Sequence, residues 1–397
     1  MRLALGTAYP FDEARTHGGV EAVAHNLAAA LTATGEVDVH VVSLSERCPV
    51  DALEHRGRLT IHWLAVRPGL GTLKALTIHA HKVAKAYRRI APDIIHAQQF
   101  SAYALGAPAT SPLVLTVHGI EWFLPEEMSA TKRYAGAVGA YRRLAEGLVI
   151  RRCLAKASTI VAISIPFVPE TIGPMLQGKR VHGIPNPLVL DRWLAVAPGE
   201  DDGRTVLCVG TIEQRKDPLT LLRAFAKVAS TCPDSRLVFA GEPTETDYHA
   251  ALLAEVSTLG LEGRVEFLGL LDEDRLLEVC ATAAVVASAA VVETAPMALA
   301  EAMAAGRAVV AVGAGGIPAM IEDGVSGFVV PFNDVDAMAD RLRQLLVDKS
   351  LRRRLGSAAR SRAHDMFGSA SVAQQTLAVY RELLSGRRAT ASGVERR

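Results

Sequence analysis

Hydrophobic and polar positions follow one pattern in both halves of the chain. Short, nearly continuous apolar runs alternate with longer segments that repeat apolar residues at helical spacing. Such runs are typical of strands buried on both faces, and their alternation with helices predicts a parallel sheet covered on both sides. In the first half, strands are predicted over 3–6, 39–43, 61–65, 93–97, 113–118 and 159–164, with helices including 20–32 and 72–90 between them.

The pattern restarts after a proline-rich joint, Pro185-Asn186-Pro187, and a polar stretch over 198–204. We expect two Rossmann-like, doubly wound α/β domains, 1–185 and 186–368, facing a central cleft, with a helix over about 369–385 packing back on the first. The polar tail 385–397 is expected to be frayed. Later strands are predicted over 206–210, 237–241, 265–268, 285–287 and 309–312, and helices over 218–229, 335–347, 351–364 and 369–384.

Composition agrees with two domains and limits the partners. The chain has 397 residues, half of them hydrophobic, which is too long for one ordinary core. Net charge is +1 overall, but residues 1–185 carry +6 and the remainder −5, so the first half favours a more anionic partner. No aromatic and basic patch typical of nucleic-acid binding is evident, and no nucleic-acid partner is expected.

Cysteine spacing and hydropathy give no sign of secretion. The five cysteines show no short pairing of the zinc or disulfide kind, which favours reduced thiols. The N-terminus is interpreted as a first strand, since its apolar run soon meets Asp12 and Glu13, and no apolar run is as long as a membrane span. We therefore expect a cytoplasmic protein.

Two carboxylates, Glu293 and Glu301, lie eight positions apart in an otherwise uncharged segment that ends at Gly306. Thr294 is suited to an N-cap and Pro296 to the first turn, so Glu301 is predicted to lie inside an apolar helix. No Lys or Arg lies within one turn of Glu301, so its partners must come from elsewhere. Sugar hydroxyls of a ligand and backbone groups of a neighbouring loop are both open alternatives.

Cations and a histidine follow two of the predicted strands. Arg215 and Lys216 lie between strand 206–210 and helix 218–229, where adjacent cations suit a diphosphate. A solvated surface pair is the alternative. His118 ends strand 113–118 and precedes Gly119, a position from which it can bind a substrate hydroxyl or stabilise charge. A purely structural histidine is the alternative there.

Glycine loops and paired aspartates give weaker signals. Gly18-Gly19 precedes helix 20–32 and lets backbone N–H groups approach a ligand, although a plain turn explains it equally and the dinucleotide spacing is absent. The glycine loop 313–318 alone indicates no ligand. The Asp-x-Asp segments 272–274 and 334–336 precede helices and are interpreted as capping acids, so no metal site is predicted.

Together, these motifs resemble the retaining, nucleotide-sugar-dependent glycosyltransferases of family 4, which have the GT-B fold. The resemblance runs from about residue 3 to about residue 380, and the order and spacing of the motifs are highly specific. One departure matters, because Thr211 stands where the family often has Arg, and Arg215 can supply that charge. The matching segments are 18–21, 116–119, 185–187, 209–216, 293–306, 311–318 and 322–327.

The resemblance implies transfer of a sugar from a nucleoside diphosphate, UDP or GDP, to an acceptor hydroxyl, with retained configuration and without a metal or further cofactor. It implies that Glu293 faces the donor sugar, that Glu301 binds the ribose and that Lys216 binds the diphosphate. The implied catalytic residues are His118 and Glu293, and the implied donor-binding residues are Gly19, Arg215, Lys216, Thr294, Ala295, Pro296, Met297 and Glu301.

Two alternatives share this fold, a nucleotide-sugar 2-epimerase and a non-catalytic carbohydrate-binding protein. The acidic pair and the Arg-Lys motif favour the transferase. The acceptor is left as a glycan, a lipid or a small-molecule glycoside. Helix 72–90 aligns Lys74, His81, Lys85 and Arg88 on one face, which suits either solvent or an anionic lipid surface at the inner face of the cell membrane.

Overall fold

A computed structural model describes residues 1–12, 19–67, 72–120, 123, 136–197 and 200–394, with the backbone alone at 72–75, 136–138 and 387–394. Its contacts divide the chain into two compact units. The first unit contains Met1–Phe123, the described part of Lys132–Pro187 and the last helix from Ser369. The second contains Leu188–Gly368.

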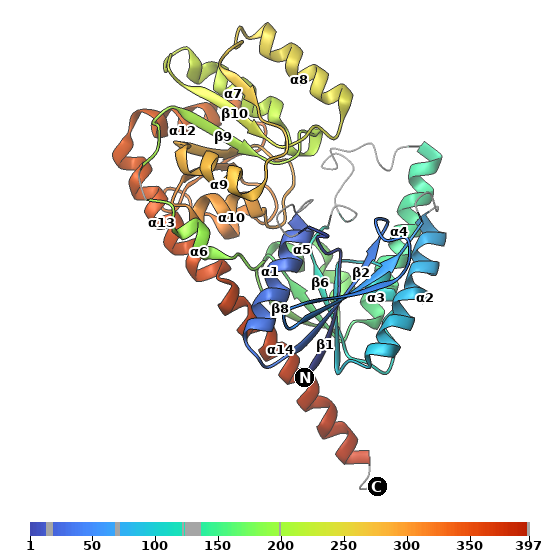
Figure 1. Cartoon of the computed structure of the whole chain (residues 1–397). Coiled ribbons are helices and arrows are strands. Elements are labelled where there is room, and N and C mark those ends of the chain that lie inside the picture. The colour runs from blue at the N-terminus through green and yellow to red at the C-terminus, as the bar shows by residue number, and fades with distance from the viewer. Residues whose placement is uncertain (13–18, 68–71, 121–122, 124–135, 198–199, 395–397) are drawn as a thin grey trace. The chain divides into compact units, whose positions relative to one another are not determined.

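The described strands of the first unit form a sheet of eight in the order β3-β4-β2-β1-β5-β6-β7-β8 (Figure 1). All neighbours are parallel except β3 and β4, which form an antiparallel hairpin. The order reverses between β1 and β5, which is where ligands bind in open α/β sheets. The strands are β1 (Arg2–Gly6), β2 (Asp38–Ser45), β3 (Ala52–Arg56), β4 (Leu59–Ala65), β5 (Ile94–Gln98), β6 (Leu113–Val117), β7 (Thr159–Ala162) and β8 (Arg180–Gly183).

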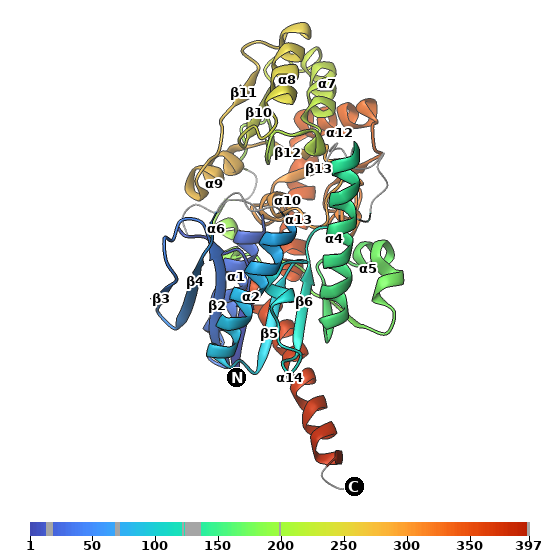
Figure 2. The ribbon, with the colours of Figure 1, turned by 90° about the vertical axis from the view of Figure 1, so that its right-hand side faces the viewer.

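Helices cover both faces of this sheet because alternate strand residues point to opposite sides. Leu3 and Leu5 pack toward α1 (Gly19–Ala33) and α14 (Ser369–Val394). Ala4 packs on the opposite side, toward α2 (Thr72–Ile90) and α4 (Gly136–Lys156), the two helices that face the viewer in Figure 2. The shorter helices are α3 (Ala102–Leu105), α5 (Phe167–Ile172) and the 3-10 turn η3 (Gly173–Leu176).

The second unit contains a sheet of six described strands in the order β11-β10-β9-β12-β13-β14, all parallel. The order reverses between β9 and β12, so the loops after these two strands border the switch point. The strands are β9 (Thr205–Val209), β10 (Arg236–Ala240), β11 (Val265–Phe267), β12 (Val285–Ser288), β13 (Ala308–Val312) and β14 (Phe328–Val330).

Two helical layers cover this second sheet. The core on one face joins alternate strand residues to α7 (Pro218–Ala229) and α12 (Val335–Val347). The core on the other face joins them to α6 (Leu190–Leu194), α10 (Met297–Ala304) and α13 (Lys349–Phe367). The remaining elements are α8 (Thr246–Thr258), α9 (Glu273–Thr282), α11 (Ile317–Met320) and the 3-10 turn η4 (Gln214–Lys216).

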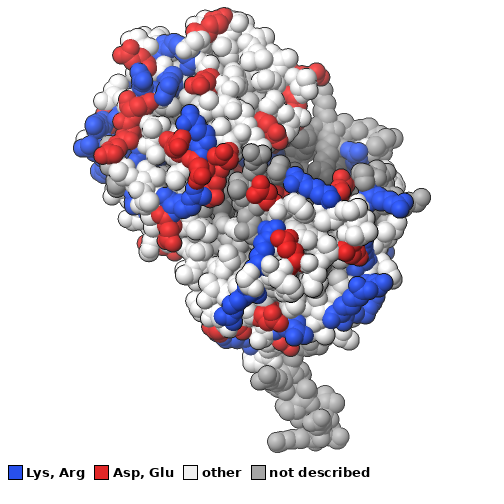
Figure 3. All heavy atoms as spheres, viewed as in Figure 1, with Lys and Arg blue, Asp and Glu red and all other residues white. Residues whose placement is uncertain are grey.

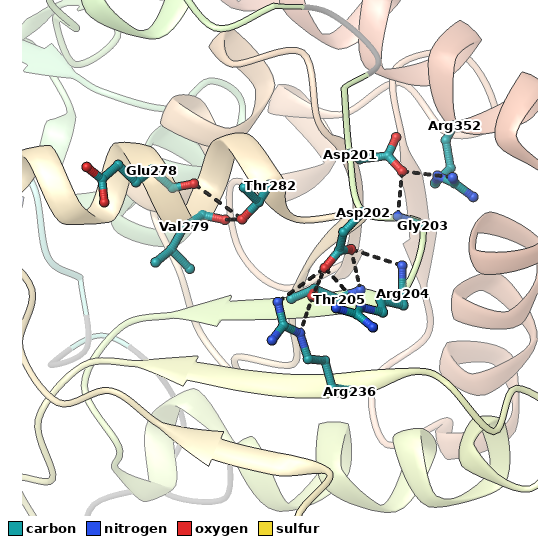
Figure 4. Close-up of polar contacts among 10 residues, drawn as sticks. All are labelled: Asp201, Asp202, Gly203, Arg204, Thr205, Arg236, Glu278, Val279, Thr282 and Arg352. Carbon is teal, nitrogen blue, oxygen red and sulfur yellow. Dashed lines mark hydrogen bonds and ion pairs between the residues drawn. The ribbon is translucent and has the colours of Figure 1, made fainter.

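A polar cluster anchors the segment that leads into β9 (Figure 4). Arg352 donates to Asp201 at 2.8 Å, and both side chains are only 5% exposed. Asp202 accepts hydrogen bonds from Arg204 N, Thr205 N and Arg236. Burial raises the pKa of Asp202, but a hydrogen bond from the Thr205 hydroxyl, the two backbone bonds and the charge of Arg236 outweigh it, so its pKa lies below the usual value. The cluster therefore fixes the start of the central strand of the second sheet.

The predicted doubly wound α/β fold is confirmed in both halves, and α2, α7 and α12 begin and end as expected. Three strands were missed, since β3 and β8 are largely polar and β14 has only three residues. The prediction of a frayed tail from residue 385 is wrong up to Val394, because α14 continues to that residue.

Candidate functional site

The loop after β9 forms the base of the candidate site. It packs directly on the loop after β10, where Gly210 N donates to Ala240 O at 2.9 Å. Gly241 allows this approach, because it adopts a φ of +155° and a Cβ there would lie 1.9 Å from Gly210 O. Gly241 also bridges to Gly269, after β11. Three glycine-containing loops therefore meet at one edge of the sheet.

Arg215 and Lys216 both reach Glu293 in the loop after β12. Lys216 Nζ donates to Glu293 Oε1, and an Arg215 Nη lies 3.5 Å from the same oxygen. The other Arg215 Nη donates to Glu213 at 2.6 Å. The Glu293 side chain is 11% exposed and both cations are about one-quarter exposed. The structure thus brings three predicted residues together and adds Glu213, which the sequence pattern did not distinguish.

Two backbone hydrogen bonds hold the loop that carries Glu293. Val291 N donates to Arg215 O at 2.9 Å, and Gly316 N donates to Glu293 O at 2.7 Å. The second bond gives a role to the glycine loop 313–318, to which the sequence assigned no ligand. That loop follows β13 and positions the neighbouring acidic segment.

Helix α10 begins slightly later than predicted. Its first residue is Met297, and Pro296 is the N-cap in an extended conformation, so the assignment of Thr294 as N-cap and Pro296 to the first turn is wrong. The backbone bends at Thr294 and Ala295 before it reaches this extended proline. Thr294 is buried, and Gly306, with a φ of +70°, follows the end of the helix as expected. Ala295 lies between Glu293 and α10, and Met297 opens the first helical turn, whose N–H groups favour anions.

Glu301 lies in the middle of α10 and is partly exposed. Burial of the carboxyl, followed by repulsion from Glu273, raises its pKa to about 7. Among the described residues, none donates a hydrogen bond to this carboxylate, so the alternative of a satisfied core carboxylate finds no support. A partly exposed acid without protein donors is suited to accept hydrogen bonds from a ligand.

His118 follows β6 directly and belongs to the first unit, where it is 8% exposed. Its Nε2 contacts Gln98 Oε1, and its backbone N–H and that of Gly119 donate to Gln99 Oε1 at 3.0 and 3.1 Å. Burial lowers the pKa of His118 to about 4. The imidazole is therefore neutral near pH 7, which favours binding a hydroxyl over stabilising negative charge.

The structure also bears on the predicted glycine loop, capping aspartates, metal ligands, cysteines and membrane spans. Gly19 opens α1 and is exposed, whereas Gly18 lies outside the described residues. The capping role of the aspartates is confirmed, because Asp272 accepts from Arg275 N and Asp334 from Ala337 N, both within 3 Å. Within the described ranges no three His, Cys, Asp or Glu residues are grouped for a metal, and all five cysteines are free. None of the helices in those ranges is long and apolar enough to cross a membrane.

Comparisons with known proteins agree on one family. The model of glycosyl transferases group 1 matches residues 192–362, and that of the glycosyl transferase 4-like domain matches residues 18–187. The chain is 27% identical to alpha-maltose-1-phosphate synthase of Mycolicibacterium smegmatis over 96% of this chain and 100% of that one. It is 35% identical to D-inositol 3-phosphate glycosyltransferase of a Nocardioides species, over 46% of this chain and 42% of that protein. The chain thus spans less than half of this second relative.

Solved structures show the same fold. Sucrose-phosphate synthase from Thermosynechococcus elongatus superimposes with a TM-score of 0.80 at 21% identity, covering 97% of this chain and 99% of that one. HepE of Anabaena, solved in complex with UDP-glucose, gives a TM-score of 0.70 at 22% identity, covering 97% and 100%.

Proposed function

The chain belongs to the group 1 glycosyltransferases of family 4, which have the GT-B fold, and from that premise we propose that it transfers a sugar, with retained anomeric configuration, from a UDP- or GDP-sugar to an acceptor hydroxyl. One observation carries the assignment of the site. Lys216 and Arg215 converge on Glu293 at the switch point of the second sheet. Cations at that place are suited to a diphosphate, and an acid beside them is suited to the sugar.

In this proposal the donor diphosphate binds at Lys216, Arg215 and the N–H groups that open α10. Without donor, the two cations are offset by Glu213 and Glu293. A diphosphate brings two or more negative charges, so it competes for Lys216 and Arg215 and leaves Glu293 facing the sugar. Thr294, Ala295, Pro296 and Met297 shape the passage from the acid to the helix.

The reaction breaks the bond between the anomeric carbon and the diphosphate oxygen. Positive charge then develops on the sugar, and Glu293 stabilises it while the cations stabilise the leaving diphosphate. The acceptor oxygen bonds to the anomeric carbon on the face that the diphosphate leaves, and its proton passes to the departing phosphate. His118 accepts a hydrogen bond from a substrate hydroxyl through its neutral ring, and Gly19 lets backbone approach the donor phosphate or the acceptor.

The nucleoside is proposed to lie at the three glycine loops, with its ribose hydroxyls on Glu301. HepE was solved with UDP-glucose, which supports a UDP-sugar, and a GDP-sugar is the other candidate. A thermal-shift screen against UDP-, GDP-, ADP- and TDP-sugars tests this, because a bound ligand raises the melting temperature. We expect a shift with UDP- or GDP-sugars that Lys216→Met abolishes. A shift that Lys216→Met leaves unchanged would place the nucleotide elsewhere.

Turnover assays separate transfer from its alternatives. Donor consumption that requires an acceptor identifies a transferase, whereas formation of an epimer without acceptor identifies an isomerase. No turnover, with nucleotide binding retained, would indicate a non-catalytic protein. Chelation with EDTA is expected to leave the rate unchanged, because Lys216 and Arg215 supply the positive charge at the diphosphate.

We also propose that the acceptor is anionic or lies at an anionic membrane surface. The exposed face of α4 presents Tyr141, Leu144 and Leu148, which are 58%, 72% and 54% exposed. Exposed cations of α4 flank these apolar residues, and the exposed face of α2 adds further cations and no acidic residue. The exposed cations are Arg142, Arg151, Arg152 and Lys156 on α4 and Lys85, Arg88 and Arg89 on α2. Figure 3 shows Lys and Arg gathered on the side of the first unit where Figure 1 places these helices.

An apolar stripe between cations is typical of helices that lie at an anionic lipid surface. Cosedimentation with vesicles of phosphatidylglycerol and phosphatidylcholine tests the contact. We expect binding that falls at high salt and is lost in Leu144→Ser/Leu148→Ser. Leu253→Ser is the control, because Leu253 is exposed on α8 of the second unit. Absence of binding by the unaltered protein would leave a soluble anionic acceptor.

A further inference from the structure

A row of polar side chains crosses the first sheet beneath α1 and α14. His96 and Gln98 on β5, Thr116 on β6 and His118 just after β6 are all at least nine-tenths buried. Their neighbours on the same face, such as Ile94 and Val114, are fully buried aliphatic residues. Because a buried polar group costs free energy unless it is paired, a row in an otherwise apolar sheet calls for a specific role.

The row is paired from end to end. Tyr380 Oη of α14 lies 2.6 Å from His96 Nδ1, and His96 Nε2 lies 2.6 Å from Thr116 Oγ1. The Gln98 amide lies between the two imidazoles, with its nitrogen 3.5 Å from His96 Nε2 and its oxygen bonded to His118 Nε2. A continuous path therefore joins His118 to a tyrosine 262 positions later in the sequence.

The direction of the Gln98 amide determines the proton positions. An amide oxygen only accepts, so the proton on His118 must be on Nε2, and Nδ1 is left as an acceptor. An amide nitrogen only donates, so the nitrogen of His96 beside it is the one without a proton. Burial lowers the pKa of His96 to about 3, so both rings are neutral near pH 7. With both rings neutral, one arrangement satisfies every contact: His118 carries its proton on Nε2, and His96 carries its proton on Nδ1.

The joint after the first sheet reaches the same row. A small cavity of about 20 Å³ is bordered by His96, Gln98 and Thr116 from the sheet. Asn186 of the proline joint and Thr376 of α14 complete its polar lining. The segment that leaves the first unit and the helix that returns to it thus both border His96, Gln98 and Thr116.

We propose that Gln98, held by the Tyr380–His96 pair, is a positioning residue that fixes His118 in its Nε2–H tautomer and so presents Nδ1 to a substrate hydroxyl. The proposal rests on the role of His118 in the proposed function. Gln99 complements it, since its side chain holds the backbone of His118 and Gly119. A merely structural row would stabilise the sheet without any consequence for the proton on His118.

Side-chain ¹⁵N NMR of the histidines tests the tautomer without requiring activity. The signals of His118 are assigned as those missing in His118→Gln. We expect a protonated Nε2 and an unprotonated Nδ1 in the unaltered protein, and mixed tautomers in Gln98→Leu. Tyr380→Phe should shift the His96 signals and partly mix the His118 tautomers. An unchanged, single His118 tautomer in Gln98→Leu would overturn the proposal.

Kinetics provide the second readout. We expect Gln98→Leu to lower kcat about tenfold and Tyr380→Phe about threefold, with the donor KM within about twofold, because a positioning bond acts on the reacting complex. Tyr87→Phe is the matched control, since Tyr87 is equally buried and its hydroxyl donates to Tyr103 O on the opposite face of the sheet. An equal loss in Tyr87→Phe would indicate a structural effect and contradict the proposal.

Gln98→Glu provides a third readout. Its carboxylate still accepts from Nε2–H but stabilises the imidazolium, so the acid limb of the kcat profile should move up by about one pH unit or more. The titratable groups that contact the row are His96 from β5 and Tyr380 from α14. An unmoved acid limb would contradict the proposal. A protein that turns over no sugar nucleotide fails the proposed function instead, and the NMR result then still decides the tautomer.

Discussion

The two units carry their candidate residues at the same place in the fold, the carboxyl edge of a parallel sheet, but surround them differently. In the second unit, Glu293, Arg215 and Lys216 form a charged cluster that remains partly exposed. In the first, His118 is buried in a neutral row of hydrogen bonds. A diphosphate needs charges that can exchange partners, whereas a hydroxyl needs a fixed acceptor, and the two surroundings match these needs.

The largest expected effect is the loss of turnover in Glu293→Gln, which distinguishes Glu293 from the other charged residues around it. Glu293→Gln should lower turnover by about 10²–10³-fold, because the amide cannot stabilise positive charge on the sugar. Its urea midpoint should change little, since the side chain lies in an exchangeable ion cluster. Glu213→Gln is the control, because it removes the other carboxylate on Arg215 and should cost far less turnover. Equal turnover in Glu293→Gln and the unaltered protein would rule out the role.

A buried ion pair of the second unit should contribute to stability, in contrast to Glu293, which is expected to contribute to turnover. Arg352→Met leaves Asp201 buried without its cation, which should cost about 3–5 kcal/mol in the free energy of unfolding. Lys227→Met is the control, because its partner Asp336 is 78% exposed and such surface pairs contribute less than about 1 kcal/mol. Urea unfolding measures both. Equal losses would mean that exposure does not distinguish structural from functional charges here.

Much of this comparison could be predicted from sequence, and the missing part has a physical cause. Glu293 was predicted because it lies in an otherwise uncharged segment before a helix, and Lys216 because it lies between a strand and a helix. Gln98 was not, since it lies inside a strand and acquires its role only from His118, twenty positions later, and from α14. The glycine loop 313–318 was recognised, but the hydrogen bond from Gly316 to Glu293 was not predicted, because its acceptor is a backbone carbonyl of another loop. Long-range hydrogen bonds leave no periodic signal in a sequence.

Smaller effects should follow from the pKa of Glu301, which is raised to about 7. Ribose hydroxyls donate to the charged form, so donor affinity should rise by up to about tenfold from pH 6 to pH 8, with release of a proton on binding. Titration calorimetry in buffers of different ionisation enthalpy measures this proton. Glu301→Gln should bind donor more weakly and lose the pH dependence. Donor affinity independent of pH would place the ribose away from Glu301.

The same shift affects stability with a defined sign. Because the folded pKa of Glu301 lies above its unfolded value of 4.5, the stabilising effect of the neutral acid is complete below about pH 4.5 and is lost as pH rises through about 7. Glu301→Gln keeps a neutral side chain at every pH. It should therefore be more stable than the unaltered protein at pH 8, by about 1–2 kcal/mol given the partial exposure, and similar to it at pH 4.5.

The smallest expected effect is the pH dependence of a substitution at His118 in the first unit. The pKa of His118 is lowered to about 4 by burial, so its ring stays neutral across the range in which Glu301 titrates. His118→Gln should lower kcat by the same factor at pH 6, 7 and 8, within about twofold, because no change of charge is involved. A factor that grows as pH falls toward 6 would show that His118 acts as a cation. The contrast between a charged donor site and a neutral site at His118 would then fail.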